Sequence, residues 1–369
     1  MNKFFGLKFN IILAFAFLFL FGAVFSVQAE GGKKDEFFKS RVLEIKNIKS
    51  EDGKYIHQEM KLKALSGSSK GEELEFKEDG NYEVLKKNIY KKGDLVLTVA
   101  SFDDVGDRTI YVTDYVRTNS LAYLLIIFAL TIIIVGGWKG ARSLLSLFLT
   151  ALVIIYFIVP KILDGNNALF VTLIGSFFIL LAIIYITEGF HKKAHLAVFS
   201  ILISLIFTVI LSWVFVSLTK LSGLSEEASL FLINIHDQVI NFKGLLLAGI
   251  VIGALGVLDD VVVSQIAVVE ELYETDKMQT QKEVFKKAYR VGVSHISSMT
   301  NTLFLAYAGA SFSLLLLFLS GGSAFSSFAD ILNNEAIATE VVRTLAGSVG
   351  LILSVPIATW MAVLFLGKR

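Results

Sequence analysis

The chain has 369 residues, of which 54% are hydrophobic and 18% charged, and its mean hydropathy is +0.67. This composition is more apolar than that of a soluble globular domain and is typical of a polytopic membrane protein. The absence of cysteine excludes disulfides, thiol catalysis and cysteine-ligated metal centres. A net charge of +1 argues against a nucleic-acid partner that is recognised through bulk charge.

Residues 1–29 are predicted to be a signal peptide or an N-terminal anchor helix. Lys3 and Lys8 form a basic start, and an apolar run from Ile11 to Phe25 follows them. The small-residue pattern that a signal peptidase recognises ends at Ala29. In either form, this segment directs the residues that follow it out of the cytoplasm.

Residues 30–117 are predicted to form a small extracytoplasmic β-rich domain. This stretch is highly charged, with 17 Lys or Arg and 18 Asp or Glu. Met60, Leu62 and Ala64 alternate with polar residues, which predicts a strand with one buried face and one exposed face. Glycine- and asparagine-rich turns separate such runs. We expect five or six strands in a β-barrel-like fold of the OB or SH3-like kind, and periodicity does not choose between the two.

Residues 118–369 are predicted to form an all-α polytopic membrane domain. A transmembrane helix needs about 20 apolar residues. Seven segments meet this requirement: Leu121–Gly137, Ser143–Leu163, Ala168–Thr187, His195–Leu218, Gly244–Val269, Ile296–Leu319 and Thr344–Leu366.

The basic residues of the connecting loops predict the orientation of these spans. If the β-rich domain lies outside, the cytoplasmic segments carry 11 basic residues and the outer loops carry 4. The cytoplasmic set is Lys139, Arg142, Lys192, Lys193, Lys277, Lys282, Lys286, Lys287, Arg290, Lys368 and Arg369, and the outer set is Lys161, Lys220, Lys243 and Arg343. Because cytoplasmic loops are enriched in Lys and Arg, this count supports seven spans with a cytoplasmic C-terminus.

Two adjacent acids, Asp259 and Asp260, interrupt the fifth predicted span. An ionised aspartate at the bilayer centre costs about 2.5–3.5 kcal/mol, so the pair is expected to face protein or water, or to carry a proton. Gly249, Gly253 and Gly256 share a helix face with Asp260 through steps of three or four residues. Since glycines let helices approach closely, Asp260 is predicted to point into a helix–helix seam and is the first candidate for a proton carrier. The alternative is a purely structural role for both acids.

The sixth predicted span supplies polar groups that are suited to meet these acids. Ser298 and Thr302 lie on one helix face, with Asn301 to the side. This stripe is predicted to form hydrogen bonds with Asp260 or to line a narrow path through the bundle. Ordinary packing of small residues is the alternative interpretation.

The segment between these two spans and the remaining polar clusters are less specific. Residues 270–294 predict either an amphipathic helix on the inner membrane surface or a solvated helical hairpin. Glu188, His191 and His195 could share a helix face, but their lysine-rich surroundings argue against a metal, and no metal or other cofactor is predicted. Because HExxH and Walker motifs are absent from the sequence, no enzymatic activity is predicted.

Several of these segments together resemble the YibE/F family of bacterial membrane proteins. The likeness is carried by Gly137-Trp-Lys-Gly140, Gly253-Ala-Leu-Gly-Val-Leu-Asp-Asp260, the acids that follow at Glu270, and His295 to Thr302. With its secreted β-rich segment, the chain resembles the longer, YibE-type member. The resemblance implies residence in the bacterial cytoplasmic membrane, with a second subunit of the same family or a homo-oligomer as partner. The last spans are more faintly similar to the membrane domains of SecD/SecF and RND exporters, in which such an aspartate serves proton-driven work.

The leading functional prediction is therefore a proton-coupled transporter or export factor. Asp259 and Asp260 would load and release the proton, and Ser298, Asn301 and Thr302 would line its route. The alternative is a membrane assembly or scaffold protein whose outer domain binds partners. A third interpretation is an intramembrane hydrolase with one of the two aspartates as acid–base group.

Overall fold

The computed structural model of the chain describes residues 35–49, 56–77, 90–102, 108–225, 232, 240–319 and 327–367. These residues belong to two compact units, which meet in the sequence between Val135 and Gly136 and are described separately below. The predicted signal segment, residues 1–29, lies outside the described residues.

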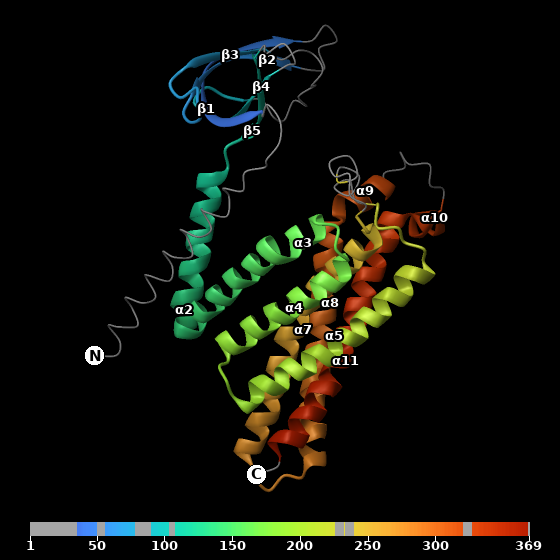
Figure 1. Cartoon of the computed structure of the whole chain (residues 1–369). Coiled ribbons are helices and arrows are strands. Elements are labelled where there is room, and N and C mark those ends of the chain that lie inside the picture. The colour runs from blue at the N-terminus through green and yellow to red at the C-terminus, as the bar shows by residue number, and fades with distance from the viewer. Residues whose placement is uncertain are drawn as a thin grey trace, which may run out of the picture. The chain divides into compact units, whose positions relative to one another are not determined.

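The N-terminal unit contains an antiparallel sheet of five strands, which confirms the predicted β-rich segment (Figure 1). The strands are β1 (Glu36–Lys49), β2 (Ile56–Ala64), β3 (Glu73–Lys77), β4 (Leu95–Phe102) and β5 (Arg108–Tyr115), in the order β3-β2-β1-β4-β5. The long β1 strand pairs with β4 through its first half and with β2 through its second half. The two edge strands, β3 and β5, also approach each other, so the sheet curves toward closure.

Alternating side chains of this sheet form its core, as the sequence pattern predicts. Phe38 and Val42 of β1 are buried, together with Met60, Leu62 and Ala64 of β2. In β2 the residues between them, Lys61 and Lys63, are charged and exposed. Opposite charges meet across β1 and β2 in the pair of Lys46 Nζ and Glu59 Oε2, which are 3.3 Å apart.

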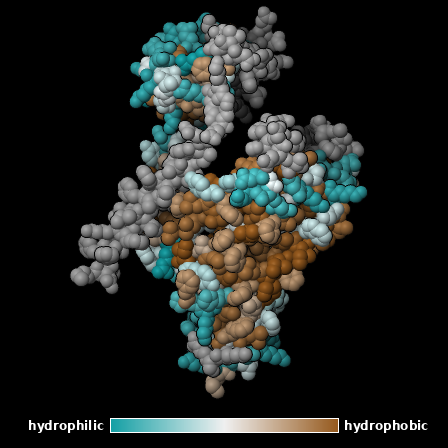
Figure 2. All heavy atoms as spheres, in the orientation of Figure 1, coloured by the Kyte–Doolittle hydropathy of each residue, from teal (hydrophilic) through white to brown (hydrophobic). Residues whose placement is uncertain are grey.

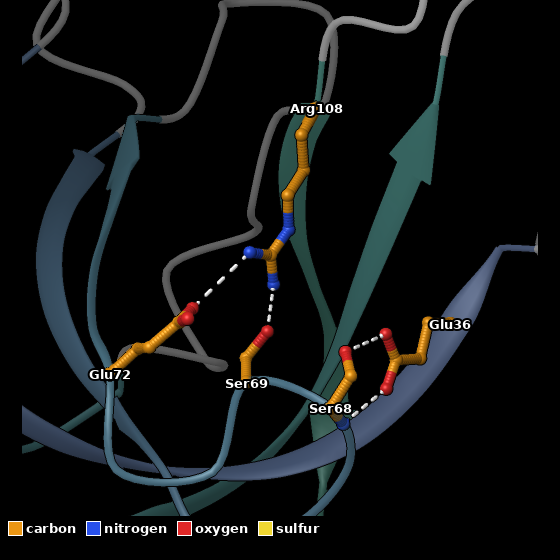
Figure 3. Close-up of polar contacts among 5 residues, drawn as sticks. All are labelled: Glu36, Ser68, Ser69, Glu72 and Arg108. Carbon is orange, nitrogen blue, oxygen red and sulfur yellow. Dashed lines mark hydrogen bonds and ion pairs between the residues drawn. The ribbon is translucent and has the colours of Figure 1, made fainter.

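The turn between β2 and β3 is tied to β1 and β5 by a polar network (Figure 3). Glu36 of β1 accepts hydrogen bonds from the backbone N–H of Ser68, at 2.6 Å, and from the Ser68 hydroxyl. Arg108 of β5 donates to the hydroxyl of Ser69 and forms an ion pair with Glu72, with 3.3 Å between Nη1 and Oε2. Strands that are distant in sequence are thereby joined at this end of the sheet.

Helices make up the rest of the described chain. They are α2 (Thr118–Val153), the π-helical turn η1 (Ile154–Ile158), α3 (Val159–Leu163), α4 (Ala168–Thr187), α5 (Lys192–Leu218), α7 (Phe242–Thr275), α8 (Gln281–Ala310), α9 (Phe312–Leu319), α10 (Phe328–Asn333) and α11 (Glu335–Leu366). Five helical segments of the described chain are long and apolar enough to cross a membrane: Thr118–Leu163, Ala168–Thr187, Lys192–Leu218, Phe242–Thr275 and Glu335–Leu366. Hydrophobic side chains accordingly dominate the visible surface of the helices (Figure 2).

The predicted total of seven spans is not confirmed by these five segments, and both differences have a local cause. The first segment contains two predicted spans, which are divided at Gly137, where φ is 55° and ψ is −132°. A straight helix of its 46 residues would be about 69 Å long, more than twice the roughly 30 Å hydrocarbon core. The predicted sixth span, Ile296–Leu319, is divided between α8 and α9 at Ser311. Its polar residues make it less apolar than the five segments that could cross a membrane.

The segment that follows Glu270 is a helical hairpin, which was one of its two predicted forms. α7 continues to Thr275, and α8 begins at Gln281 after a five-residue connection. The Thr280 hydroxyl accepts the Glu283 N–H, and the Glu283 carboxylate accepts the Thr280 N–H, which forms a capping box. Since α8 then runs unbroken to Ala310, no separate surface helix exists between residues 281 and 294.

Helices α7 and α11 occupy the middle of the helical bundle. α7 packs against α4, α5, α8 and α11, and α11 also packs against α5 and α8. Apolar residues such as Leu255, Leu258 and Val262 fill the contact surface of α7. The packing direction of α7 therefore decides where each of its two aspartates lies.

Candidate functional site

The two adjacent aspartates of α7 occupy different surroundings. Asp259 is partly buried, and its Oδ1 atom is enclosed without a hydrogen-bond partner among the described residues. Asp260 is exposed. The prediction that Asp260 points into a helix–helix seam is therefore wrong for the packing within this chain. The apolar face with Leu255 and Leu258 packs into the bundle and turns Asp260 outward.

The face of α7 that carries the three glycines points outward with Asp260, away from the core of the bundle. Gly249 and Gly256 are exposed, and a Cβ atom added to either one would meet no atom within 4 Å. Gly253 differs, because a Cβ atom there would lie 2.7 Å from the hydroxyl oxygen of Tyr307 in α8. Of the three glycines predicted to serve close helix packing, Gly253 alone does so against the described residues.

Glu188 is the acid that sequence spacing did not connect to Asp259. It follows the last residue of α4, a helix that packs against α7, and lies in the neighbourhood of Asp259. Lys139, just beyond the bend of α2, forms an ion pair with Glu188, with 3.7 Å between Nζ and Oε1. Three acids and one lysine from α7, the end of α4 and α2 therefore share one region.

This region lies at one end of α4. A second ion pair, farther along α7, links this helix to the start of α5, with 3.3 Å between Lys193 Nζ and Glu270 Oε2. The hydroxyl of Tyr185 and Nδ1 of His195 are 2.7 Å apart. Asp259 itself lies about 16 Å before Glu270 along α7, so these polar groups mark the ends of α4 and α5 and do not surround Asp259.

The described residues contain no group of three His, Asp or Glu side chains that could hold a metal ion. Of the three residues considered for such a site, Glu188 pairs with Lys139 and His195 with Tyr185. The site contains titratable groups, but the described residues provide no set of ligands for a metal ion.

The polar stripe of α8 faces away from the bundle. Ser298, Asn301 and Thr302 are all exposed. The hydroxyl of Thr302 donates to the backbone carbonyl of Ser298 at 3.1 Å, within its own helix. In the part of the chain that the structure describes, no hydrogen bond joins these residues to Asp260, so the predicted pairing is not formed there.

A buried glutamine joins three helices, and the sequence analysis did not single it out. Gln265 of α7 is 2% exposed. Its Nε2 atom donates to the carbonyl of Ala288 in α8, at 2.9 Å, and to the hydroxyl of Thr359 in α11, at 2.7 Å. Gly292 leaves room for it, since a Cβ atom there would lie 2.8 Å from Gln265 Oε1. The only sequence signal was a polar residue about one and a half helical turns beyond the aspartates.

Two further polar features of the bundle were also missed. Buried hydroxyls recur every four residues on one face of α5, at Ser200, Ser204, Thr208 and Ser212. In α11, Arg343 and Glu340 form an ion pair at 3.1 Å, with both side chains 20% exposed. The sequence analysis had placed Arg343 in a loop before the last span, because its charge interrupts the apolar run.

The long apolar helices and the acids among them define a class of protein, a helical integral membrane protein with an N-terminal antiparallel sheet. The family model described as YibE/F-like protein matches residues 124–368. The chain belongs to the YibE/F-like family, which the motifs around Asp260 and His295 indicated. Comparison with curated proteins and with solved structures found no match.

Proposed function

We propose that this protein is a proton-coupled transporter or export factor of the bacterial cytoplasmic membrane, and that Asp259 is its proton-carrying group. The N-terminal sheet would lie outside and the C-terminus in the cytoplasm, in accordance with the distribution of basic residues. The observation that carries the proposal is the enclosed Oδ1 atom of Asp259, which no hydrogen-bond donor of the described residues satisfies. Keeping a bare carboxylate there costs free energy, and a bound proton removes that cost.

The surroundings of Asp259 support reversible loading. Asp260 next to it is exposed on the outer face of α7, so the two acids differ in their surroundings although they are adjacent in the chain. Glu188 is partly exposed, with 21% of its side chain accessible, and it lies in the neighbourhood of Asp259. We assign Glu188 the role of relaying protons between water and Asp259, and Lys139 the role of orienting the Glu188 carboxylate.

This assignment revises the order of the candidates. The sequence favoured Asp260, with Ser298, Asn301 and Thr302 along the route. Because these four side chains are exposed, Asp259 and Glu188 are the stronger candidates for proton transfer.

A complementation experiment tests the proposal directly. A deletion strain receives wild type, Asp259→Asn, Glu188→Gln or the control Asp276→Asn, whose acid lies exposed in the α7–α8 connection. At matched membrane levels, we expect Asp259→Asn to abolish and Glu188→Gln to weaken complementation, while the control complements. Proton uptake by proteoliposomes with a pH-sensitive dye should fail for Asp259→Asn. Full complementation and proton uptake by Asp259→Asn would contradict the proposal.

The alternative, a membrane assembly protein, is favoured by one feature of the sheet. Phe37 of β1 and Tyr111 of β5 flank Val99 of β4, and these two aromatic side chains are 62% and 41% exposed, although Val99 between them is buried. Aromatic side chains on an exposed sheet face are suited to bind a partner. If this function is the correct one, Phe37→Ser with Tyr111→Ser abolishes complementation and Asp259→Asn does not.

The hydrolase interpretation makes a different prediction. Glu188 near Asp259 supplies the second carboxylate that such chemistry requires. A hydrolase would turn over substrate in detergent without a proton gradient, and it would need both acids.

A further inference from the structure

The outward face of the α7–α8 hairpin carries polar groups in a part of the chain that is otherwise apolar. Asp260 of α7 and Ser297, Ser298 and Asn301 of α8 are exposed, and the structure gives none of these side chains a hydrogen-bond partner within the described residues. We call these four residues the polar belt. Gly256 of α7 lies beside the belt, with open space around its Cα atom.

The members of the belt lie at one depth. From Asp260 to the last residue of α7, Thr275, the helix rises through fifteen residues, or about 22 Å. The antiparallel α8 reaches the same height fifteen residues after Gln281, at Ile296. The belt residues of α8 follow within about one and a half turns, so that acceptor and donors form a band across both helices.

A band of this kind requires a polar cover. Hydrocarbon offers no hydrogen bonds, and exposed polar side chains in a span therefore associate with protein or water. The exposed Gly249 and Gly256 leave room for another helix to approach α7 closely. The face thus combines the space for a close contact with groups that need hydrogen bonds.

We propose that the occupant is a second copy of this chain, packed through the α7–α8 face about a two-fold axis along the membrane normal. Both copies insert in the same direction, so this symmetry brings their belts together at equal depth. Asp260 accepts hydrogen bonds, while Asn301 and Ser298 donate them. In an isologous contact, Asp260 of each copy therefore meets donors of the other copy. The interface stands independently of any proton transfer at Asp259.

The natural absence of cysteine makes a disulfide test clean. Ser298→Cys and Asn301→Cys are introduced singly and oxidised with copper phenanthroline in proteoliposomes that contain only this protein at a low protein-to-lipid ratio. The control is Ile206→Cys on α5, which is 58% exposed and lies within about one turn of the same depth, counted from the Lys193–Glu270 pair.

We expect dimers from at least one of the two belt variants and at least tenfold less dimer from Ile206→Cys. Adding Gly256→Leu should reduce the crosslinked fraction at least fivefold, and the monomer should fold normally because open space surrounds this glycine. Three outcomes would overturn the proposal: no dimer from either belt variant, equal crosslinking at Ile206→Cys, or crosslinking unaffected by Gly256→Leu. Crosslinking in native membranes only, to a species of another mass, would show that a different protein covers the belt.

Discussion

The hydrogen bonds of Gln265 allow a quantitative test of how the bundle is held together. In Gln265→Leu the side chain keeps roughly its size, and the two bonds that Nε2 donates are lost. The Thr359 hydroxyl keeps a hydrogen bond, because it still donates to the Val355 carbonyl at 2.7 Å, and the Ala288 carbonyl lies inside the backbone hydrogen-bond ladder of α8. At about 0.5–1.5 kcal/mol for each bond, the free energy of unfolding should fall by about 1–3 kcal/mol.

Gln265→Glu should cost more, although it changes fewer atoms. A glutamate carboxylate cannot donate to the carbonyl of Ala288, and it places a charge in a site that is 2% exposed. Moving an unpaired ion out of water into such a site costs several kcal/mol. The control is Gln281→Glu at the exposed first position of α8, where a negative charge favours the helix N-terminus.

Thermal unfolding of the purified protein in detergent, followed by size-exclusion fluorescence, measures the order of stability. We expect wild type and the control Gln281→Glu to be equally stable. Gln265→Leu should be less stable than both, and Gln265→Glu less stable than Gln265→Leu. A Gln265→Glu protein as stable as Gln265→Leu would refute the reasoning, because it would mean that water or a rearrangement satisfies the carboxylate.

Two further predictions concern the sheet and α11. Hydrogen bonds from Ser68, together with the charge of Arg108, hold the pKa of Glu36 below its ordinary value, so its stabilising effect is full above about pH 4.3 and is lost as pH falls through the lowered pKa. Thermal unfolding of the sheet should therefore show Glu36→Gln less stable than wild type at pH 7 and the difference vanishing in acid; a constant difference would contradict this. Arg343→Met should lower the unfolding temperature, because Glu340 loses its ion pair with Arg343 and keeps a largely buried charge. The double variant with Glu340→Leu should recover most of the loss. Equal stability of the single and double variants in the same detergent assay would contradict it.

The sequence predicted those parts of the fold that depend on local pattern. Alternation in β2 correctly assigned Met60 and Leu62 to the core. Apolar length located most of the spans, because a helix in lipid must satisfy its backbone within itself. The motif around Asp260 indicated the YibE/F-like family, which the match over residues 124–368 confirmed.

The predictions that failed depended on which neighbour covers a given helix face. Glycine spacing identified the residues that share a face with Asp260, and it did not indicate that this face lies outside the bundle. Glu188 is 71 positions from Asp259 along the chain, so only packing of α4 on α7 reveals their proximity. Gln265 was overlooked because a single polar residue in an apolar helix has no pattern to distinguish it.

The hydroxyls of α5 affect how that helix can move. Ser204, Thr208 and Ser212 each donate to the carbonyl four residues earlier in α5, at 2.7–2.9 Å. None of these three bonds reaches α11, although α5 and α11 pack extensively. A displacement of α5 along α11 would break none of these three bonds, but it would break the hydrogen bond from the Ser200 hydroxyl to Met361 Sδ, at 3.3 Å, and move Thr208 away from Gly350. A Cβ atom on Gly350 would overlap the Thr208 hydroxyl, so this close fit sets the register of α5 on α11, as the Gln265 junction fixes α11 to α7 and α8.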